Sequence, residues 1–303
     1  MPSDAILPVA SPEHVRVLAR AKINLSLRVL ARETSGYHQI ETVFCALELA
    51  DEIEITRAHG DVTLEVTAPP GEPGIPPDLG PVGSNLAMRA AAAFFEATDL
   101  DGGVHIRLTK RIPAGAGLGG GSSDAAAVLR ALNQMSAQAL ADTSLLALGS
   151  RLGSDVPFFL ADAALALAWG RGERMLPLSP PPAARVVLAV PRERVSTADA
   201  YAALDPARAP TPMVLRSLST WRDIASVAHN DFEDVIFARH PHLRDVRQSL
   251  EDAGATIARM TGSGSVIFGV FEDVAAADAA AQSVSTAHPR IETLVTQTRA
   301  SLI

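Results

Sequence analysis

Apolar and polar residues alternate along the N-terminal part of the chain, which is the period of a β-strand with one buried face. Residues 14–30 (HVRVLARAKINLSLRVL) keep this alternation over a length that fits one long strand or two paired strands. Residues 51–58 (DEIEITRA) and 61–68 (DVTLEVTA) repeat it on either side of a His-Gly pair, and so predict a hairpin. A loop rich in proline and glycine follows at residues 69–83.

The remaining segments mix helical and strand patterns in no regular order. Helices are predicted at residues 85–100, 122–135, 144–153, 243–254 and 274–287, and strands at residues 103–113, 185–191 and 264–271. Ser84 and either Ser122 or Ser123 are the expected N-caps of the first two helices. This irregular order favours an α+β fold over a regularly alternating parallel sheet. The proline-rich residues 179–184 (SPPPAA) are the best candidate for a linker between two domains.

Composition narrows the class of protein. A net charge of −8 over 303 residues argues against a broad basic surface, and therefore against nucleic acid or an anionic membrane as the partner. The single cysteine, Cys45, excludes an internal disulfide framework and a multi-cysteine zinc site. The first residues form no signal-peptide pattern, and the longest apolar patch, residues 163–169, is much shorter than a membrane span. We therefore expect a soluble, cytoplasmic protein.

Residues 111–126 (RIPAGAGLGGGSSDAA) form a glycine-rich loop that we expect to bind an anion. The loop satisfies the dinucleotide pattern GxGxxG, but Pro113 interrupts the strand-to-helix turn that this pattern requires. It also lacks the Lys-Ser/Thr pair of a Walker A loop. Glycines let a ligand approach the backbone, and a helix N-terminus attracts negative charge. A tight flexible connection is the alternative, but the flanking strand, helix start and Lys110-Arg111 pair favour phosphate binding.

Lysine is rare in this chain. Lys22 and Lys110 are the only lysines among 26 Lys and Arg residues, so these two positions could need a compact charge on a thin stem rather than a planar guanidinium. Chance survival under a composition biased against lysine is the alternative. Lys110 adjoins the glycine loop, and Lys22 lies in an otherwise apolar strand, where a charge is costly without a partner or a cleft.

Three separated segments resemble the motifs of the GHMP kinase family. Residues 19–30 (ARAKINLSLRVL) are similar to the first motif, residues 113–127 (PAGAGLGGGSSDAAA) to the phosphate loop, and residues 259–269 (RMTGSGSVIFG) to the third motif. Four more segments are similar to family members that act on a cytidine diphosphate derivative of methylerythritol in the non-mevalonate isoprenoid route: residues 36–44, 153–160, 170–178 and 195–204.

The resemblance implies an α+β fold of two domains with the active site in the cleft between them. An N-terminal ribosomal-S5-like, ATP-binding domain would span residues 1–178, and a C-terminal ferredoxin-like, substrate-binding domain residues 179–303. Asn85 and Lys110 would lie near the adenine nucleotide. The triphosphate would rest on Pro113, Ala114, Gly115, Ala116, Gly117, Leu118, Gly119, Gly120, Gly121, Ser122 and Ser123. Mg²⁺ is expected to bridge the β- and γ-phosphates, and Ser123 is the only metal ligand that the sequence suggests.

The resemblance also implies the roles of two catalytic residues. Asp155 would be the general base that accepts the proton of the C2 hydroxyl of the methylerythritol unit, and Lys22 would hold Asp155 ionised and stabilise the transferred charge. From its local sequence alone, Asp155 fits a helix cap better.

The acceptor would lie opposite the nucleotide. The resemblance implies that its cytosine lies between Tyr37 and Tyr201, with His38 contacting the edge of the base. Asn24, two residues from Lys22 on the same strand face, would touch the acceptor. Ordinary packing of the two tyrosines and an exposed histidine in a turn are the alternatives.

Two other functions stay open at this point. Another small-molecule GHMP kinase, such as homoserine or mevalonate kinase, would have an acceptor without cytosine. A non-catalytic nucleotide-binding module would use the same glycine loop without a general base. In each case we expect a small-molecule partner and a monomer or weak homodimer.

Overall fold

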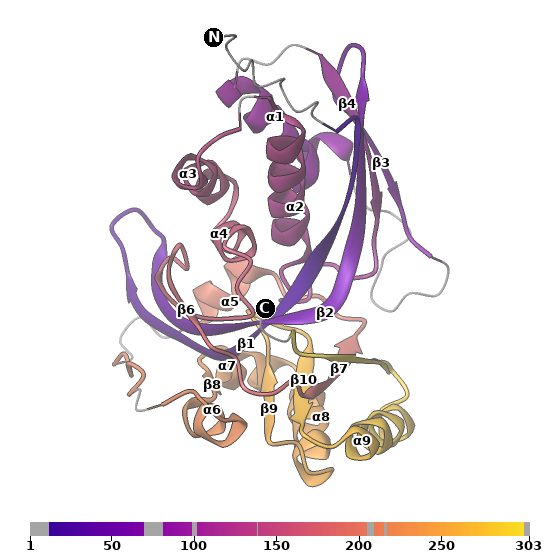
Figure 1. Cartoon of the computed structure of the whole chain (residues 1–303). Coiled ribbons are helices and arrows are strands. Elements are labelled where there is room, and N and C mark those ends of the chain that lie inside the picture. Colours follow the sequence, from indigo (N-terminus) through magenta and orange to yellow (C-terminus); the bar gives the residue numbers. More distant parts are fainter. Residues whose placement is uncertain are drawn as a thin grey trace, which may run out of the picture.

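The computed structural model describes residues 12–69, 81–98, 102–137, 139–204, 209–214 and 217–299. The first residues, for which no signal peptide is expected, lie outside these ranges. Most of the proline- and glycine-rich loop predicted at residues 69–83 also lies outside them. The described part contains two sheets with helices packed on them (Figure 1).

The first sheet is built on two long antiparallel strands, β1 (His14–Arg32) and β2 (His38–Ala58). The alternating pattern of residues 14–30 is therefore one strand and not two. One end of β2 pairs with β4 (Gly103–Thr109) and the other end with β5 (Leu165–Gly170), which pairs in turn with β6 (Arg174–Leu178). The short strand β8 (His229–Asn230) adds to the free edge of β1 in parallel.

The predicted hairpin between residues 51–58 and 61–68 is wrong. β4 lies between the two segments, antiparallel to β2 and parallel to β3 (Thr63–Thr67). Alternation shows that a segment is a strand, but it does not specify its neighbour, and here a later strand takes the place between them.

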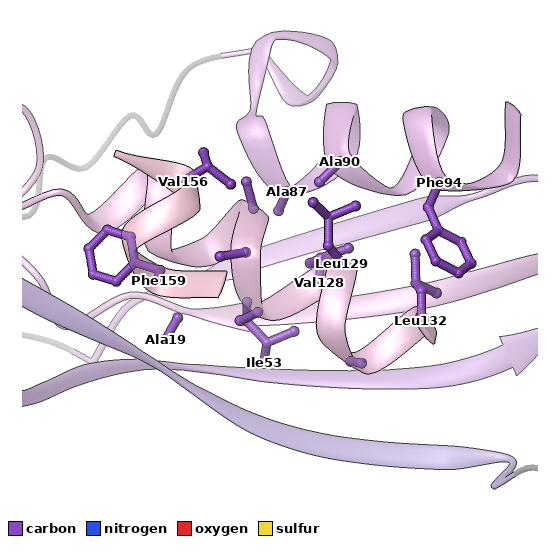
Figure 2. Close-up of a cluster of buried hydrophobic side chains, with 14 of the residues drawn as sticks. Ala19, Ile53, Ala87, Ala90, Phe94, Val128, Leu129, Leu132, Val156 and Phe159 are labelled. Carbon is purple, nitrogen blue, oxygen red and sulfur yellow. The ribbon is translucent and has the colours of Figure 1, made fainter. Parts of the chain in front are cut away.

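Helices cover one face of the first sheet (Figure 1). They are the 3-10 turn η1 (Val82–Ser84), α1 (Leu86–Thr98), α2 (Gly120–Met135), α3 (Asp142–Leu152) and α4 (Val156–Leu160). Figure 2 shows Phe94 of α1 beside Leu132 of α2, with Ile53 of β2 below α2. All three side chains are buried, and full burial of such a side chain contributes about 1.5–3 kcal/mol. This core fixes α2, whose first turn borders the glycine loop.

Two helix starts differ from their predictions. Asn85 rather than Ser84 caps α1, because its Oδ1 accepts from the Ala87 N–H at 2.9 Å. α2 begins at Gly120 and not at a serine, since Gly119 has φ of 73° and the left-handed region favours glycine.

The second sheet has the order β11-β7-β10-β9 and is antiparallel throughout. Its strands are β7 (Arg185–Pro191), β9 (Ile257–Met260), β10 (Ile267–Phe271) and β11 (Ile291–Gln297). The helices that follow β7 along the chain are α5 (Thr197–Ala203), α6 (Trp221–Val227), α7 (Glu233–Arg239), α8 (Pro241–Asp252) and α9 (Val274–Ala287). α8 and α9 pack on this sheet, on the far side of β1 and β2 from the first group of helices (Figure 1). No helix in the described ranges is long and apolar enough to cross a membrane.

Candidate active site

The glycine loop and the segment after β7 line a pocket of about 700 Å³. The lining residues are Val66, Asn85, Leu86, Lys110, Ile112, Pro113, Ala114, Gly115, Ala116, Gly117, Leu118, Gly119, Gly120, Gly121, Ser122, Asp124, Arg194 and Thr197. Every predicted nucleotide-binding residue except Ser123 is among them. The first turn of α2 lines this pocket with Gly120, Gly121 and Ser122. The N–H groups of a helix's first turn have no partner within the helix, an arrangement that attracts anions.

Ser123 lies elsewhere. Its side chain is buried, and it lines a second cavity of about 20 Å³ together with Arg20 and Arg130. Because α2 starts at Gly120, Ser122 and Ser123 are separated by about 100° around the helix, so the first borders the pocket and the second faces inward.

A second glycine-rich turn packs directly on the first. A Cβ atom at Gly117, which has φ of 79°, would come within 2.2 Å of the Thr261 carbonyl oxygen, and one at Gly262 within 2.9 Å of the Gly117 Cα. Only glycine permits two backbones to approach so closely. The third motif of the sequence, residues 259–269, is thereby held against the glycine loop.

Lys110 is committed to two carboxylates. Its ammonium donates to Asp51 and, at 2.7 Å, to Oδ2 of Asp124, and all three side chains are buried. Asp51 also accepts from the backbone N–H groups of Arg111 at 2.5 Å and Ile112 at 2.8 Å, which ties the start of the glycine loop to β2. Burial favours the neutral amine, but the attraction of Asp124 and Asp51 outweighs it and raises the pKa of Lys110. Lys110 therefore borders the pocket as part of a neutralised cluster.

The cluster of Lys110, Asp51 and Asp124 has one more negative group than positive. Burial raises the pKa of Asp124 from 3.8 to about 8; Lys110 opposes this effect and the charge of Asp51 adds to it. The Oδ1 atom of Asp124 is buried and has no hydrogen-bond partner among the described residues. A proton on Asp124 at neutral pH removes the excess charge.

This raised pKa predicts a pH dependence of stability. The folded protein keeps the proton of Asp124 up to about pH 8, whereas the unfolded chain releases it near pH 4. The stability that this proton contributes is present below about pH 4 and is lost as the pH rises through about 8. We expect the free energy of unfolding of the parent protein to fall, relative to that of Asp124→Asn, between pH 5 and pH 9 in urea titrations. Parallel pH profiles of the two proteins would contradict the assignment.

Lys22 and Asp155 meet on the other side of the glycine loop. The Lys22 Nζ lies 3.3 Å from Oδ2 of Asp155, and it donates to the Gly117 carbonyl oxygen at 2.9 Å and to Oδ1 of Asn24 at 2.8 Å. Lys22 is buried in the middle of β1, and Asp155 is the residue before α4, with 28% of its side chain exposed. The structure thus brings together two predicted catalytic residues that are far apart in the sequence.

Asn24 joins three parts of the structure. Its Oδ1 accepts from Lys22, from the Gly262 N–H at 3.0 Å and from the Thr261 hydroxyl at 3.3 Å, while its Nδ2 donates to Thr42 at 2.8 Å. Asn24 is itself buried, so these bonds hold β1 against the second glycine-rich turn beside Lys22. Its contact with the acceptor stays a prediction.

Of the predicted aromatic residues, His38 lies beside Tyr201 in α5. The rings of His38 and Tyr201 stack, with centroids 4.4 Å apart, and Phe232 packs edge-on against Tyr201 at 4.9 Å. Burial, followed by the charge of Asp155, raises the pKa of Tyr201 to about 12, so its hydroxyl stays protonated. Burial, followed by the charge of Arg32, lowers the pKa of His38 and favours its neutral imidazole. His38 thus stacks on one face of the Tyr201 ring. The predicted contact of His38 with the edge of a cytosine stays a prediction.

Tyr37 has a different neighbour. The Arg171 guanidinium lies 4.1 Å from the centre of the Tyr37 ring, and Glu33 holds it through its NH2 group at 2.6 Å. Tyr37 is 56% exposed, so much of this ring remains accessible. A cytosine between Tyr37 and Tyr201 stays a prediction.

The sequence did not single out several residues that the structure places at the site. They are Asp51 and Arg194, together with Asp124, Thr261 and Thr197, which lie in the motif segments but were given no role of their own. An acid at the end of the apolar run before residue 51 was a usable signal for Asp51, since a carboxylate in a strand with a buried face needs a partner. No local pattern marks Arg194, which comes to the site only through the fold.

The residues present fit a metal ion that the nucleotide carries. The described ranges hold no cluster of three or more His, Cys, Asp or Glu side chains that could bind a metal ion. Mg²⁺ in kinase sites is usually held by substrate phosphates and one or two protein oxygens. The Ser122 hydroxyl is an oxygen that the pocket offers for this purpose.

Comparison with known proteins gives a consistent picture. Residues 85–163 match the GHMP kinases N terminal domain, and residues 213–290 match the GHMP kinases C terminal domain. The 4-diphosphocytidyl-2-C-methyl-D-erythritol kinase of Solibacter usitatus (strain Ellin6076) is 39% identical over 275 residues, which cover 88% of this chain and 84% of the relative.

Solved structures agree with this match. A crystal structure of 4-(cytidine 5'-diphospho)-2C-methyl-D-erythritol kinase has a TM-score of 0.77 at 35% identity, covering 93% of this chain and 98% of that one. Homoserine kinase from Cytophaga hutchinsonii ATCC 33406 has a TM-score of 0.69 at 19% identity, covering 97% of each chain, and shares the fold. The predicted α+β fold of two domains is confirmed.

Proposed function

Because this chain belongs to the GHMP kinase family and is a small-molecule kinase, we propose that it phosphorylates 4-diphosphocytidyl-2-C-methyl-D-erythritol. ATP would donate its γ-phosphate to the C2 hydroxyl and give the 2-phosphate, a step of the non-mevalonate isoprenoid route. The names of relatives at 35–39% identity support this acceptor. The Lys22–Asp155 pair beside the glycine loop is the observation that carries the transfer chemistry.

The triphosphate would lie along the glycine loop. Phosphoryl transfer depends mostly on positioning and on stabilisation of charge, so backbone N–H groups at a fixed helix start are suitable binding groups. The contact of Gly117 with Gly262 sets the path of the loop, and the Lys110 cluster anchors its beginning. When bound with the nucleotide, Mg²⁺ would neutralise charge on the β- and γ-phosphates.

Asp155 would act as the general base. The acceptor oxygen attacks the γ-phosphorus, the bond to the β-phosphate oxygen breaks, ADP leaves, and the hydroxyl proton passes to the Asp155 carboxylate. Lys22 orients that carboxylate at 3.3 Å and supplies positive charge where negative charge develops. Its other bonds, to Gly117 and Asn24, fix the ammonium between the phosphate loop and the base.

The acceptor would extend from Asp155 toward Tyr201 and His38. Tyr201 lies close enough to Asp155 for the carboxylate charge to raise the pKa of its hydroxyl. An aromatic base could stack on these rings or on the accessible face of Tyr37, which Arg171 holds from the other side. Homoserine and mevalonate contain no base, so such an aromatic group would have no role for them.

The proposal is tested by an acceptor-dependence assay. ADP release from ATP and Mg²⁺ is measured with the cytidine diphosphate acceptor, with homoserine and with mevalonate, each against a reaction without acceptor. We expect turnover with the cytidine compound and only background with the other two. Turnover confined to homoserine or mevalonate would refute the acceptor assignment. Release that never exceeds the background would instead favour a non-catalytic nucleotide-binding module.

A further inference from the structure

The charges that line the pocket leave one cation without a partner. Lys110 is neutralised by Asp51 and Asp124, and Lys22, on the far side of the glycine loop, pairs with Asp155. Arg194 is the other basic side chain in the pocket wall. Among the described residues no ion pair or side-chain hydrogen bond involves Arg194.

The position of Arg194 places its side chain over the glycine loop. A methyl group added at Gly115 would lie 3.8 Å from the Cδ atom of Arg194. Gly115 lies between β4 and α2, whereas Arg194 lies between β7 and α5. Residue 194 is exposed, so its guanidinium can reach a ligand in the pocket. Arg194 and the first turn of α2 thus line the same pocket.

The backbone that carries Arg194 is fixed at both ends. The Glu193 carbonyl oxygen accepts from the Ser265 hydroxyl at 2.5 Å, and Thr197 bonds with the Ser263 hydroxyl at 3.0 Å. Both serines belong to the second glycine-rich turn, which packs on Gly117 beside Lys22. Arg194 is therefore anchored to the part of the site where the reacting phosphate would lie.

We propose that Arg194 binds the β- and γ-phosphates of the nucleotide and closes the phosphate site from the C-terminal half of the chain. This inference rests on the proposed use of ATP as the donor. A guanidinium offers a planar fork of N–H donors that can bind two phosphate oxygens at once. Both lysines of the chain are already bonded to carboxylates, so among the residues that the structure describes in the pocket wall Arg194 supplies the uncommitted positive charge.

Equilibrium binding of ATP, ADP and AMP, each with Mg²⁺, to the full-length chain tests the proposal. Arg194→Gln is expected to weaken ATP binding about tenfold, as for the loss of a hydrogen bond between charged groups, and to change AMP binding less than twofold. Arg194→Lys keeps the charge without the fork and should give an intermediate loss. Arg192→Gln, an exposed neighbour outside the pocket wall, makes the same change in net charge and is expected to bind all three nucleotides like the parent.

Two results would overturn the inference: equal ATP affinities of the Arg194→Gln and Arg192→Gln variants, or an equal loss of ATP and AMP binding in Arg194→Gln. Thermal unfolding of each variant shows whether the fold is intact. The assay also separates this inference from the proposed function. If the parent protein shows no acceptor-dependent turnover but Arg194→Gln selectively loses ATP affinity, the role of Arg194 is supported and the proposed reaction is refuted. If the parent protein is active and Arg194→Gln binds ATP as tightly as the parent does, only the proposed role of Arg194 is refuted.

Discussion

Replacement of Asp155 by Asn is expected to lower turnover by about 10²–10⁴-fold, the usual contribution of a general base. The amide keeps the shape of the side chain but cannot accept the hydroxyl proton. ATP affinity should change little, because Asp155 is not part of the pocket wall formed by the glycine loop. Lys22 retains its bonds to Gly117 and Asn24, so the strand around it should keep its structure.

The measurement is acceptor-dependent ADP release together with calorimetric titration of ATP. Asp142→Asn is a matched control, since Asp142 lies in the first turn of α3, is exposed, and does not line the pocket. It should leave both quantities unchanged. Near-normal turnover of Asp155→Asn would show that another group accepts the proton.

Replacement of Lys22 by Arg should be almost as damaging, although the charge is kept. The Lys22 side chain is only 4% exposed, and a Cβ atom at Gly119 would meet its Cγ and Cε atoms at 3.1 Å, so the glycine loop closely encloses the stem. A guanidinium is wider than an ammonium and would have to displace Asp155 or the loop. Displacements of about 1 Å in a reacting geometry can reduce rates about 10²-fold, and we expect a loss of this order in kcat.

Two companion variants separate charge from shape. Lys22→Met keeps a slender stem without the charge and should also lose turnover. Arg20→Lys replaces arginine by lysine at a half-buried position of the same strand and should remain active. Urea unfolding of each variant separates lost chemistry from lost stability. Wild-type turnover in Lys22→Arg would mean that the scarcity of lysine at this position carries no functional information.

The sequence predicts the elements of this protein better than their arrangement. Periodicity locates β1, α8 and α9 because each buries one face along a continuous segment. It fails for β3, whose partner is β4, because pairing is decided by long-range packing. It also misplaces the start of α2, where the left-handed conformation of Gly119 overrides the capping preference of the serines.

The candidate site shows the same division. The glycine loop predicts an anion site from local chemistry alone, and its residues do line a pocket. The proximity of Lys22 to Asp155 has no local signal and was expected only from the resemblance to a family. The partners of Lys110 and the approach of Arg194 to Gly115 depend on side chains from segments that the fold brings together, and no spacing along the chain encodes them.

The long strand β1 connects the two halves of the protein and so limits how they can move relative to each other. β1 pairs with β2 and β8, and in its middle Asn24 bonds to Thr261 and Gly262 beside the second sheet. The second sheet is thus tied to β1 beside Lys22 as well as through the peptide chain between β6 and β7. A rotation of one half about the chain between β6 and β7 would break the Asn24 bonds, so these bonds oppose a hinge motion of the two halves.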